Sequence, residues 1–136
     1  MEYNFIKHTM TGKRFEDRIT VTRNRVIGLP TQFCEINSIQ DFMYAVLFYD
    51  KTNNAIGIKF TNEITETGKI KITKNNQGNG AHIPATSFFK ANRINTKKYA
   101  GRYEHKKVKI IDEDGQQITV IAFNLKEKEE KTWIDI

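Results

Sequence analysis

Several features of common protein classes are scarce in this chain of 136 residues. Its one cysteine, Cys34, cannot form a disulfide within the chain and has no second cysteine to complete a metal-ligand spacing. No apolar run approaches the roughly 18 residues that span a bilayer. The first 18 residues also lack the apolar core of a secretory signal. We therefore expect a protein of a reducing compartment, the cytoplasm, with no membrane association.

The spacings that mark common catalytic and metal sites are missing as well. His8, His82 and His105 are far apart and belong to no H-x-x-x-H or H-E-x-x-H pattern. The acidic residues 112–114 fall in a predicted turn, where solvated carboxylates are usual and general acid–base catalysis would lack a buried partner. Cys34 lies near a predicted helix start, which can activate a thiol, but a buried cysteine is the commoner case. We expect no enzymatic activity, no cofactor and no metal.

Prolines are few, and both mark the same point of a repeated pattern. Pro30 and Pro84 are the only two in the chain. Each ends a short apolar strand and stands at the start of a short helix, where the fixed backbone of proline is well suited. This pair anchors the alignment of two units, residues 18–61 and 69–123.

The first unit predicts the order strand, strand, short helix, strand, strand. Ile19 and Val21 alternate with threonines, as in a half-buried strand. The turn residues 50–54 separate two apolar runs and predict a hairpin. The predicted strands are 18–23, 26–29, 44–49 and 55–60, and the helix runs from Pro30–Thr31 to Ile36.

The second unit repeats that order. Asp114–Gly115 is a strong hairpin signal between its last two strands. The glycine-containing segment 75–80 is interpreted as a hairpin turn rather than a phosphate-binding loop, because no helix begins directly after it. Phe88 or Phe89 takes the place of Phe33 in the helix. The predicted strands are 69–74, 82–83, 106–111 and 118–123, and the helix is 84–92.

One such unit would expose sheet edges and half a core, which a second unit can cover. The sequence therefore predicts a mainly β (α+β) fold, a small barrel made of two strand-strand-helix-strand-strand repeats within a single domain, 1–136. A charged tail, 126–136, ends in an apolar segment that contains Trp133. The tail is either a solvated linker whose Trp133 docks on a neighbouring subunit or the last element of the barrel.

This order of elements resembles the AbrB-like swapped-hairpin barrels and, because two units share one chain, particularly the MraZ transcriptional regulators. The resemblance is carried by ITVTRNRVIGLPTQF (19–33) and IKITKNNQGNGAHIPATSFF (70–89), set against a family pattern of strand, Gly-Arg, apolar residues, Pro and short helix. It covers residues 18–123 as a pattern of elements. It implies a barrel that binds DNA with basic residues of its strand-turn-strand region. Arg25 takes the place of the family's arginine, whereas Asn24 replaces the preceding glycine and the second unit has Gly80–Ala81.

Positive charge is concentrated in one part of the chain. Residues 1–68 carry eight Lys/Arg and eight Asp/Glu, a net charge of zero. Residues 69–109 carry eleven Lys/Arg and only Glu104 as an acid, a net of +10, and residues 110–136 carry a net of −4. A stretch of one sign without compensating acids favours binding of a polyanion over an ordinary solvated surface.

The candidate site follows this basic segment and the first strand-turn-strand. Lys69, Lys71 and Lys74 are expected to project from one face of a strand and to follow a phosphate backbone. Tyr99 and Tyr103 are interleaved with cations and could stack on single-stranded bases, or belong to the core. The predicted nucleic-acid-binding residues are Arg23, Arg25, Lys69, Lys71, Lys74, Lys90, Arg93, Lys97, Lys98 and Arg102.

The sequence thus predicts a DNA-binding module, a small regulator of transcription or an accessory factor, which grips phosphates of duplex DNA or of a single-stranded nucleic acid. Because phosphate contacts carry no sequence information, no target sequence is predicted. The alternative is a protein-interaction module, an inhibitor or assembly component, whose basic face meets an acidic protein partner. Two units per chain permit a monomer, and the family resemblance permits a homo-oligomer.

Overall fold

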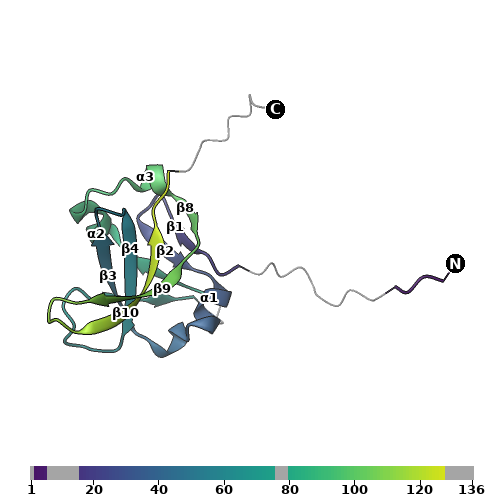
Figure 1. The fold of residues 1–136 in the computed structure, drawn as a ribbon, viewed down its shortest axis with the longest axis horizontal. Coiled ribbons are helices and arrows are strands. Elements are labelled where there is room, and N and C mark those ends of the chain that lie inside the picture. Colours follow the sequence, from purple (N-terminus) through teal and green to yellow (C-terminus); the bar gives the residue numbers. More distant parts are fainter. Residues whose placement is uncertain (1, 6–15, 76–79, 128–136) are drawn as a thin grey trace, which may run out of the picture.

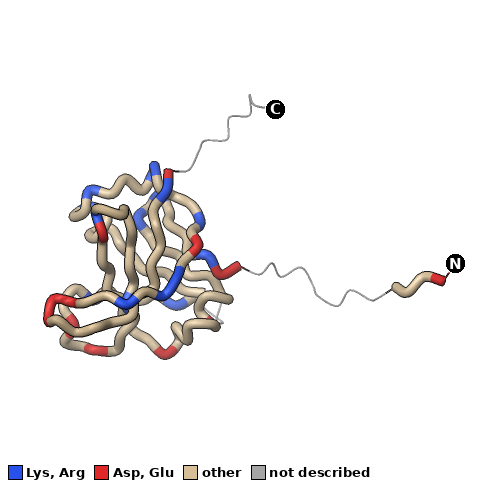
Figure 2. Tube along the Cα trace, in the orientation of Figure 1, with Lys and Arg blue, Asp and Glu red and all other residues tan. Residues whose placement is uncertain are grey.

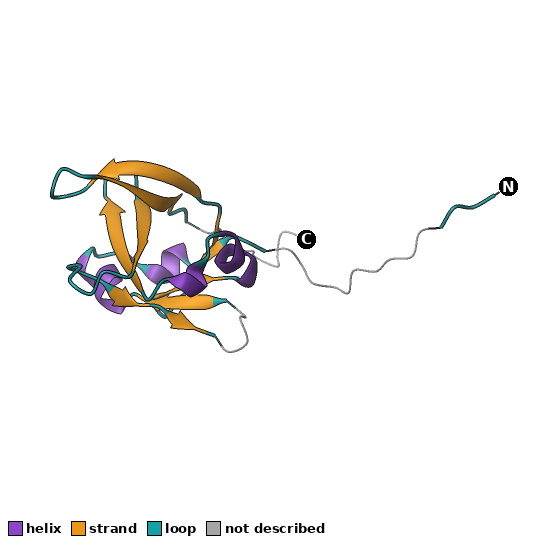
Figure 3. Ribbon diagram, turned by 90° about the horizontal axis from the view of Figure 1, so that it is seen from below, coloured by secondary structure: helices purple, strands orange, loops and turns teal. Residues whose placement is uncertain are grey.

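The computed structural model describes residues 2–5, 16–75 and 80–127, and in this part of the chain the fold is mainly β. Two antiparallel five-stranded sheets form separate layers, with short helices between them (Figures 1 and 3). Sheet A has the order β6 (Thr73–Lys74), β7 (Ala81–Pro84), β2 (Val26–Leu29), β1 (Ile19–Val21), β8 (Gly101–Tyr103). Sheet B has the order β5 (Ile70–Lys71), β3 (Tyr44–Asp50), β4 (Ala55–Thr61), β10 (Gln117–Asn124), β9 (Lys106–Ile111). The helices are α1 (Thr31–Ile36), the 3-10 helix η1 (Ile39–Asp41), α2 (Thr86–Ala91) and α3 (Thr96–Tyr99).

Two segments pass from one sheet to the other. Ile72 separates β5 from β6; its side chain is buried and its N–H donates to the carbonyl of Met43 at 2.9 Å. Glu104 and His105 separate β8 of sheet A from β9 of sheet B. At each of these two segments, which we call corners, the chain leaves the hydrogen-bonded ladder of one sheet before it joins the ladder of the other sheet. The predicted barrel is therefore not closed among the described residues, and the strands form two sheets.

The alternation of apolar residues in the short strands is confirmed by their burial. Ile19 and Val21 of β1 and Ile27 of β2 point into the space between the sheets. Phe33 of α1 and Phe89 of α2 are fully buried and fill that space from the helices. Burial of large side chains of this kind contributes roughly 1.5–3 kcal/mol each. The core thus joins both predicted units.

Hairpin turns form where Gly, Asn and Asp cluster in the sequence. Between β9 and β10, the Asp112 carboxylate accepts hydrogen bonds from the N–H groups of Asp114 and Gln116, at 3.0 and 2.8 Å, and Gly115 has a φ of 77°. Asn75 donates to the carbonyl of Gly80 at 3.0 Å, so 75–80 closes a hairpin between β6 and β7, although residues 76–79 lie outside the described ones. These turns confirm two of the three predicted hairpins, and the antiparallel pairing of β3 with β4 confirms the third.

The end of β10 is tied to the rest of the fold. The N–H of Leu125 donates to the carbonyl of Asn54 at 2.8 Å, and the hydroxyl of Tyr103 donates to the carbonyl of Lys126 at 3.0 Å. Most of the predicted tail, with Trp133, lies outside the described residues. In the described part of the chain, no helix is long and apolar enough to cross a membrane.

Candidate nucleic-acid interface

The turn between β1 and β2 presents the two arginines predicted from the first unit. Thr22 donates from its N–H to the carbonyl of Val26 at 2.9 Å, and Arg25 donates to the carbonyl of Thr22 at 3.2 Å. Arg23 and Asn24 are exposed at the tip, and Arg25 has a φ of 64°. A non-glycine residue in this left-handed region is uncommon and such strain concentrates at functional sites.

The second unit holds this turn in place. The N–H of Ala85 donates to the carbonyl of Arg25 at 3.0 Å, and the Thr96 hydroxyl donates to the carbonyl of Arg23 at 2.9 Å. Thr96 is buried at the first position of α3, so its neighbour Lys97 is brought beside the turn while its own side chain stays exposed. We call Arg23, Arg25 and Lys97 the turn cluster. The hydrogen bond between Thr96 and Arg23, 73 positions apart in the chain, thus brings basic residues of both units together.

Arg93 and Lys90 extend the positive surface along α2. Both side chains are exposed, Lys90 in the last turn of the helix and Arg93 just beyond its end. Arg93 has a φ of 55°. The segment from Arg93 to Thr96 leads directly to the turn cluster.

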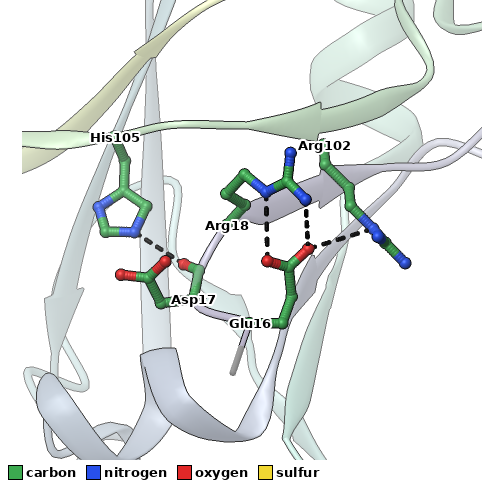
Figure 4. A network of polar contacts seen from close by, with 5 residues as sticks. All are labelled: Glu16, Asp17, Arg18, Arg102 and His105. Atoms are coloured by element: carbon green, nitrogen blue, oxygen red, sulfur yellow. Dashed lines mark hydrogen bonds and ion pairs between the residues drawn. The ribbon is translucent and has the colours of Figure 1, made fainter. Parts of the chain in front are cut away.

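Two other predicted residues carry acidic partners. Lys98 forms an ion pair with Glu127 at 2.6 Å. Arg102 lies 3.3 Å from the carboxylate of Glu16, which is also bound by Arg18 at 3.0 Å (Figure 4). The hydrogen bond and charge of Arg18 lower the pKa of Glu16, and the nearby Arg102 contributes. Any phosphate that approaches Arg102 therefore competes with a carboxylate.

The three lysines of the 69–74 strand do not form one row, because the strand bends at Ile72. Lys69 and Lys71 are exposed at the edge of sheet B, where the Lys69 ammonium lies 5.7 Å from the centre of the Tyr44 ring. Lys74 lies beyond the bend, in sheet A, and donates to the carbonyl of Gln40 at 2.7 Å. The expected single face of lysines was wrong because the sequence pattern contains no signal for the corner.

The outer face of sheet A carries a shallow depression of about 500 Å³, which we call the sheet A groove. The strand registers place Thr73, His82, Gly28, Thr20 and Arg102 in one row across the five strands. Small side chains at the centre of this row leave the face open. The groove reaches Asn24 in the turn between β1 and β2 at one end and Asn75 beside Lys74 at the other. The turn cluster thus adjoins one end of the groove, whereas the side chain of Lys74, which pairs in register with buried Ala81, lies on the inner face of sheet A.

Two roles were predicted for Tyr99 and Tyr103, stacking on bases or a place in the core, and their burial distinguishes between these roles. Tyr103 is 3% exposed, with its ring 5.3 Å from that of Phe123 and its hydroxyl bonded to the carbonyls of Tyr99 and Lys126. Tyr99 is half-buried and packs against the core. Tyr103 is therefore a core residue and offers no stacking surface, since strand β8 turns it inward.

Two groups considered in the sequence analysis, Cys34 and the metal-ligating side chains, can be located among the described residues. Cys34 is 2% exposed, and burial raises the pKa of its thiol to about 11. No three His, Cys, Asp or Glu side chains in residues 2–5, 16–75 and 80–127 lie close enough together to hold a metal ion.

Comparison with known proteins assigns this chain to no family. No family model matches it, and no curated protein or solved structure shows significant similarity to it. The function is therefore inferred from the geometry of the chain itself.

Proposed function

We propose that this protein is a DNA-binding module, a small regulator or accessory factor, which holds the phosphate backbone along the sheet A groove. The observation that carries the proposal is the position of the turn cluster beside Asn24, at one end of that groove. Arg23 and Lys97 are exposed and, among the described residues, no acidic side chain forms an ion pair with either. Free cations of this kind attract phosphates from a distance.

The proposed mechanism is electrostatic. Each Lys or Arg that neutralises a phosphate releases condensed counterions, so affinity falls steeply with salt. Hydrogen bonds from Ala85 and Thr96 hold the backbone carbonyls of Arg25 and Arg23, so the backbone that carries these two arginines is positioned before binding. Preorganisation of this kind reduces the entropy lost on association.

The proposal includes the internal duplication expected from the sequence, as in AbrB-like swapped-hairpin barrels. Three strand pairings that involve the first unit each have a counterpart that involves the corresponding strands of the second unit. The pairing β1–β2 corresponds to β6–β7, β3–β4 corresponds to β9–β10, and β1–β8 corresponds to β5–β3. The other two pairings, β2–β7 and β4–β10, each join a strand to its own counterpart. A twofold axis between the units 18–61 and 69–123 would produce this combination, because elements on an axis contact their own copies.

A duplicated groove has a functional consequence under this proposal. The axis would pass beside the pair Gly28 and His82 at the centre of the sheet A groove, so both units would contribute to one binding face. The two turns at the ends of the groove would then be equivalent positions. Duplex DNA, whose two strands are themselves related by local twofold axes, has the matching symmetry.

The test is fluorescence anisotropy with labelled duplex and single-stranded DNA of mixed sequence, over a range of salt concentrations. We expect Arg23→Gln and Lys97→Gln each to weaken binding and to reduce the slope of log affinity against log salt by about one. Lys51→Gln is the matched control, since it removes an exposed cation from the turn between β3 and β4, away from the groove.

Two results would contradict the proposal. The wild-type protein would show no binding to either DNA at low salt, or Lys51→Gln would weaken binding as much as Lys97→Gln does. The first result would favour the alternative of a protein-interaction module with an acidic partner.

A further inference from the structure

Strand β9 is an edge of sheet B in the described part of the chain, with no described strand on its second side. Among the described residues, β9 pairs with β10 alone. The N–H of Asp112 donates to the carbonyl of Gln116, so these two residues form a hydrogen-bonded pair. Hydrogen-bonded and non-hydrogen-bonded pairs alternate along an antiparallel ladder, so this pair fixes which residues of β9 direct their backbone groups toward β10. Ile110 and Val108 therefore direct their backbone groups toward β10. Lys107, Lys109 and Ile111 direct their N–H and C=O groups away from the sheet.

The outer face beside this edge is apolar. Val108 and Ile110 of β9 lie next to Val120 of β10, and beyond them lie Gly57 of β4 and Phe48 of β3, around a depression of about 520 Å³. Val120 is buried, although it does not belong to the main core between the sheets. Ile111, at the end of the edge, is 67% exposed. An additional strand beside β9 would extend this apolar face.

Charge is distributed along the β9–β10 hairpin with opposite signs at its two ends. Lys106 and Lys107 begin β9, and Glu113 and Asp114 occupy the turn that follows it (Figure 2). All four side chains are exposed, and within the described ranges none of them forms an ion pair. An antiparallel copy of the same hairpin would bring each end beside the opposite charge.

We propose that β9 pairs antiparallel with β9 of a second copy of this chain, about a twofold axis at Ile110, and so joins two B sheets into one. Lys109 and Ile111 would then exchange backbone hydrogen bonds with Ile111 and Lys109 of the second copy. Lys106 and Lys107 of each copy would lie beside the turn that carries Glu113 and Asp114 of the other copy, twice by symmetry. The two Ile110 side chains would meet on the apolar outer face, where a non-hydrogen-bonded pair brings side chains closest.

Registers shifted toward the start of β9 are less favourable. An axis at Lys109 would place Lys109 opposite its own copy, and an axis at Val108 would place Lys107 opposite Lys109, which sets like charges against each other. Lysines on an edge strand commonly prevent pairing with other chains. In this hairpin the acidic turn supplies the compensating charges, which makes the edge selective for its own copy.

The experiment is sedimentation velocity of the full chain, without nucleic acid, from micromolar to near-millimolar concentration. We expect a monomer–dimer equilibrium in the wild-type protein. Lys109→Pro removes an N–H that points away from β10, so it should abolish the dimer while the hairpin ladder stays intact. Lys109→Ala keeps that N–H and is the matched control, which should still dimerise. Circular dichroism spectra verify that each variant is folded.

The register is tested by exchange of charges. Glu113→Lys should weaken dimerisation by about tenfold, since two facing pairs become repulsive. Adding Lys107→Glu to Glu113→Lys should restore it. A wild-type protein that stays monomeric over the whole range, a Lys109→Pro variant that dimerises like the wild type, or a double variant without restored dimerisation would overturn the proposal.

Discussion

Asn37 and Asn92 end their helices in the same way. Each donates from its side-chain Nδ2 to the carbonyl of a phenylalanine four residues earlier, Phe33 at 3.0 Å and Phe88 at 2.9 Å. The residue after each asparagine, Ser38 or Arg93, has a left-handed backbone with φ of 54° or 55°. The carbonyl groups at a helix end lack partners within the helix, so these side chains satisfy one of them at each end.

The left-handed residue that follows Asn37 gives the first prediction. Ser38 is exposed, so replacing it affects mainly the backbone. Ser38→Gly should raise the free energy of unfolding by about 0.5–1 kcal/mol, because glycine adopts positive φ without strain. Ser38→Ala keeps a side chain at this position and should not stabilise. Chemical denaturation of the three proteins checks this, and equal stabilisation by alanine would contradict it.

Gly80 gives a prediction with a clear steric cause. It has a φ of 89°, and a Cβ added there would lie 2.6 Å from the carbonyl oxygen of Leu29. Gly80→Ala should lower the free energy of unfolding by about 3 kcal/mol or more, through strain and displacement of the backbone. Gly115 has a φ of 77° with no atom within 4 Å of an added Cβ. Gly115→Ala should therefore cost only about 1 kcal/mol, from the backbone alone.

The comparison is made by thermal or urea unfolding of both variants. A smaller loss for Gly80→Ala than for Gly115→Ala would show that the contact with Leu29 does not determine stability at this turn.

Cys34 should be unreactive in the folded protein. Burial raises the pKa of its thiol from 9.0 to about 11, so the thiolate is about a hundredfold rarer than in the unfolded chain near neutral pH. Reaction with a disulfide reagent should be slower by at least that factor than in denaturant. Equal rates in the folded and unfolded protein would contradict the buried position of Cys34.

The same shift predicts loss of stability in alkali. Above pH 9 the unfolded chain loses the thiol proton while the folded protein retains it, so the unfolded state binds fewer protons. The contribution of Cys34 to the free energy of unfolding is complete below pH 9 and declines as the pH rises toward 11. Cys34→Ala should lack this contribution to the alkaline decline, as measured by urea unfolding at several pH values.

Glu16 gives a prediction that depends on the proposed function. Its carboxylate lies beside Arg18 and Arg102 and competes with phosphate for them (Figure 4). Glu16→Gln should raise affinity for DNA by about threefold at low salt and by less at high salt, because salt screens exposed charges. Glu63→Gln, an exposed acid after β4, is the control for net charge. Equal gains in the two variants would show that net charge, and not release of Arg102, is responsible.

The short-range features of the fold could be predicted from the sequence. Alternation of Ile19 and Val21 with threonines defined a strand with one buried face, because successive side chains of a strand point to opposite sides. Pro30 located the start of α1, and Gly115 located the last hairpin turn, because each residue restricts or permits particular backbone angles. These signals act within a few residues.

The position of the basic residues in space depended on contacts between distant segments. Lys69, Lys71 and Lys74 follow one another in the sequence, yet the bend at Ile72 divides them between two sheets, because the Ile72 side chain is buried at the corner. Lys97 is brought near Arg23 by the hydrogen bond from the hydroxyl of its neighbour Thr96 to the carbonyl of Arg23, and no local sequence pattern predicts that contact.

The amino-acid sequence by itself determined most of the strands, but neither β8 nor the break at Ile72. It also determined the concentration of positive charge between residues 69 and 109, since both follow from residue type and spacing. Only the tertiary structure decided which cations stand free beside a groove and which meet an acid such as Glu16 or Glu127. It also decided that β9 is an edge. The reason is that pairing between strands and between charges is fixed by the packing of the whole core, and not by neighbours along the chain.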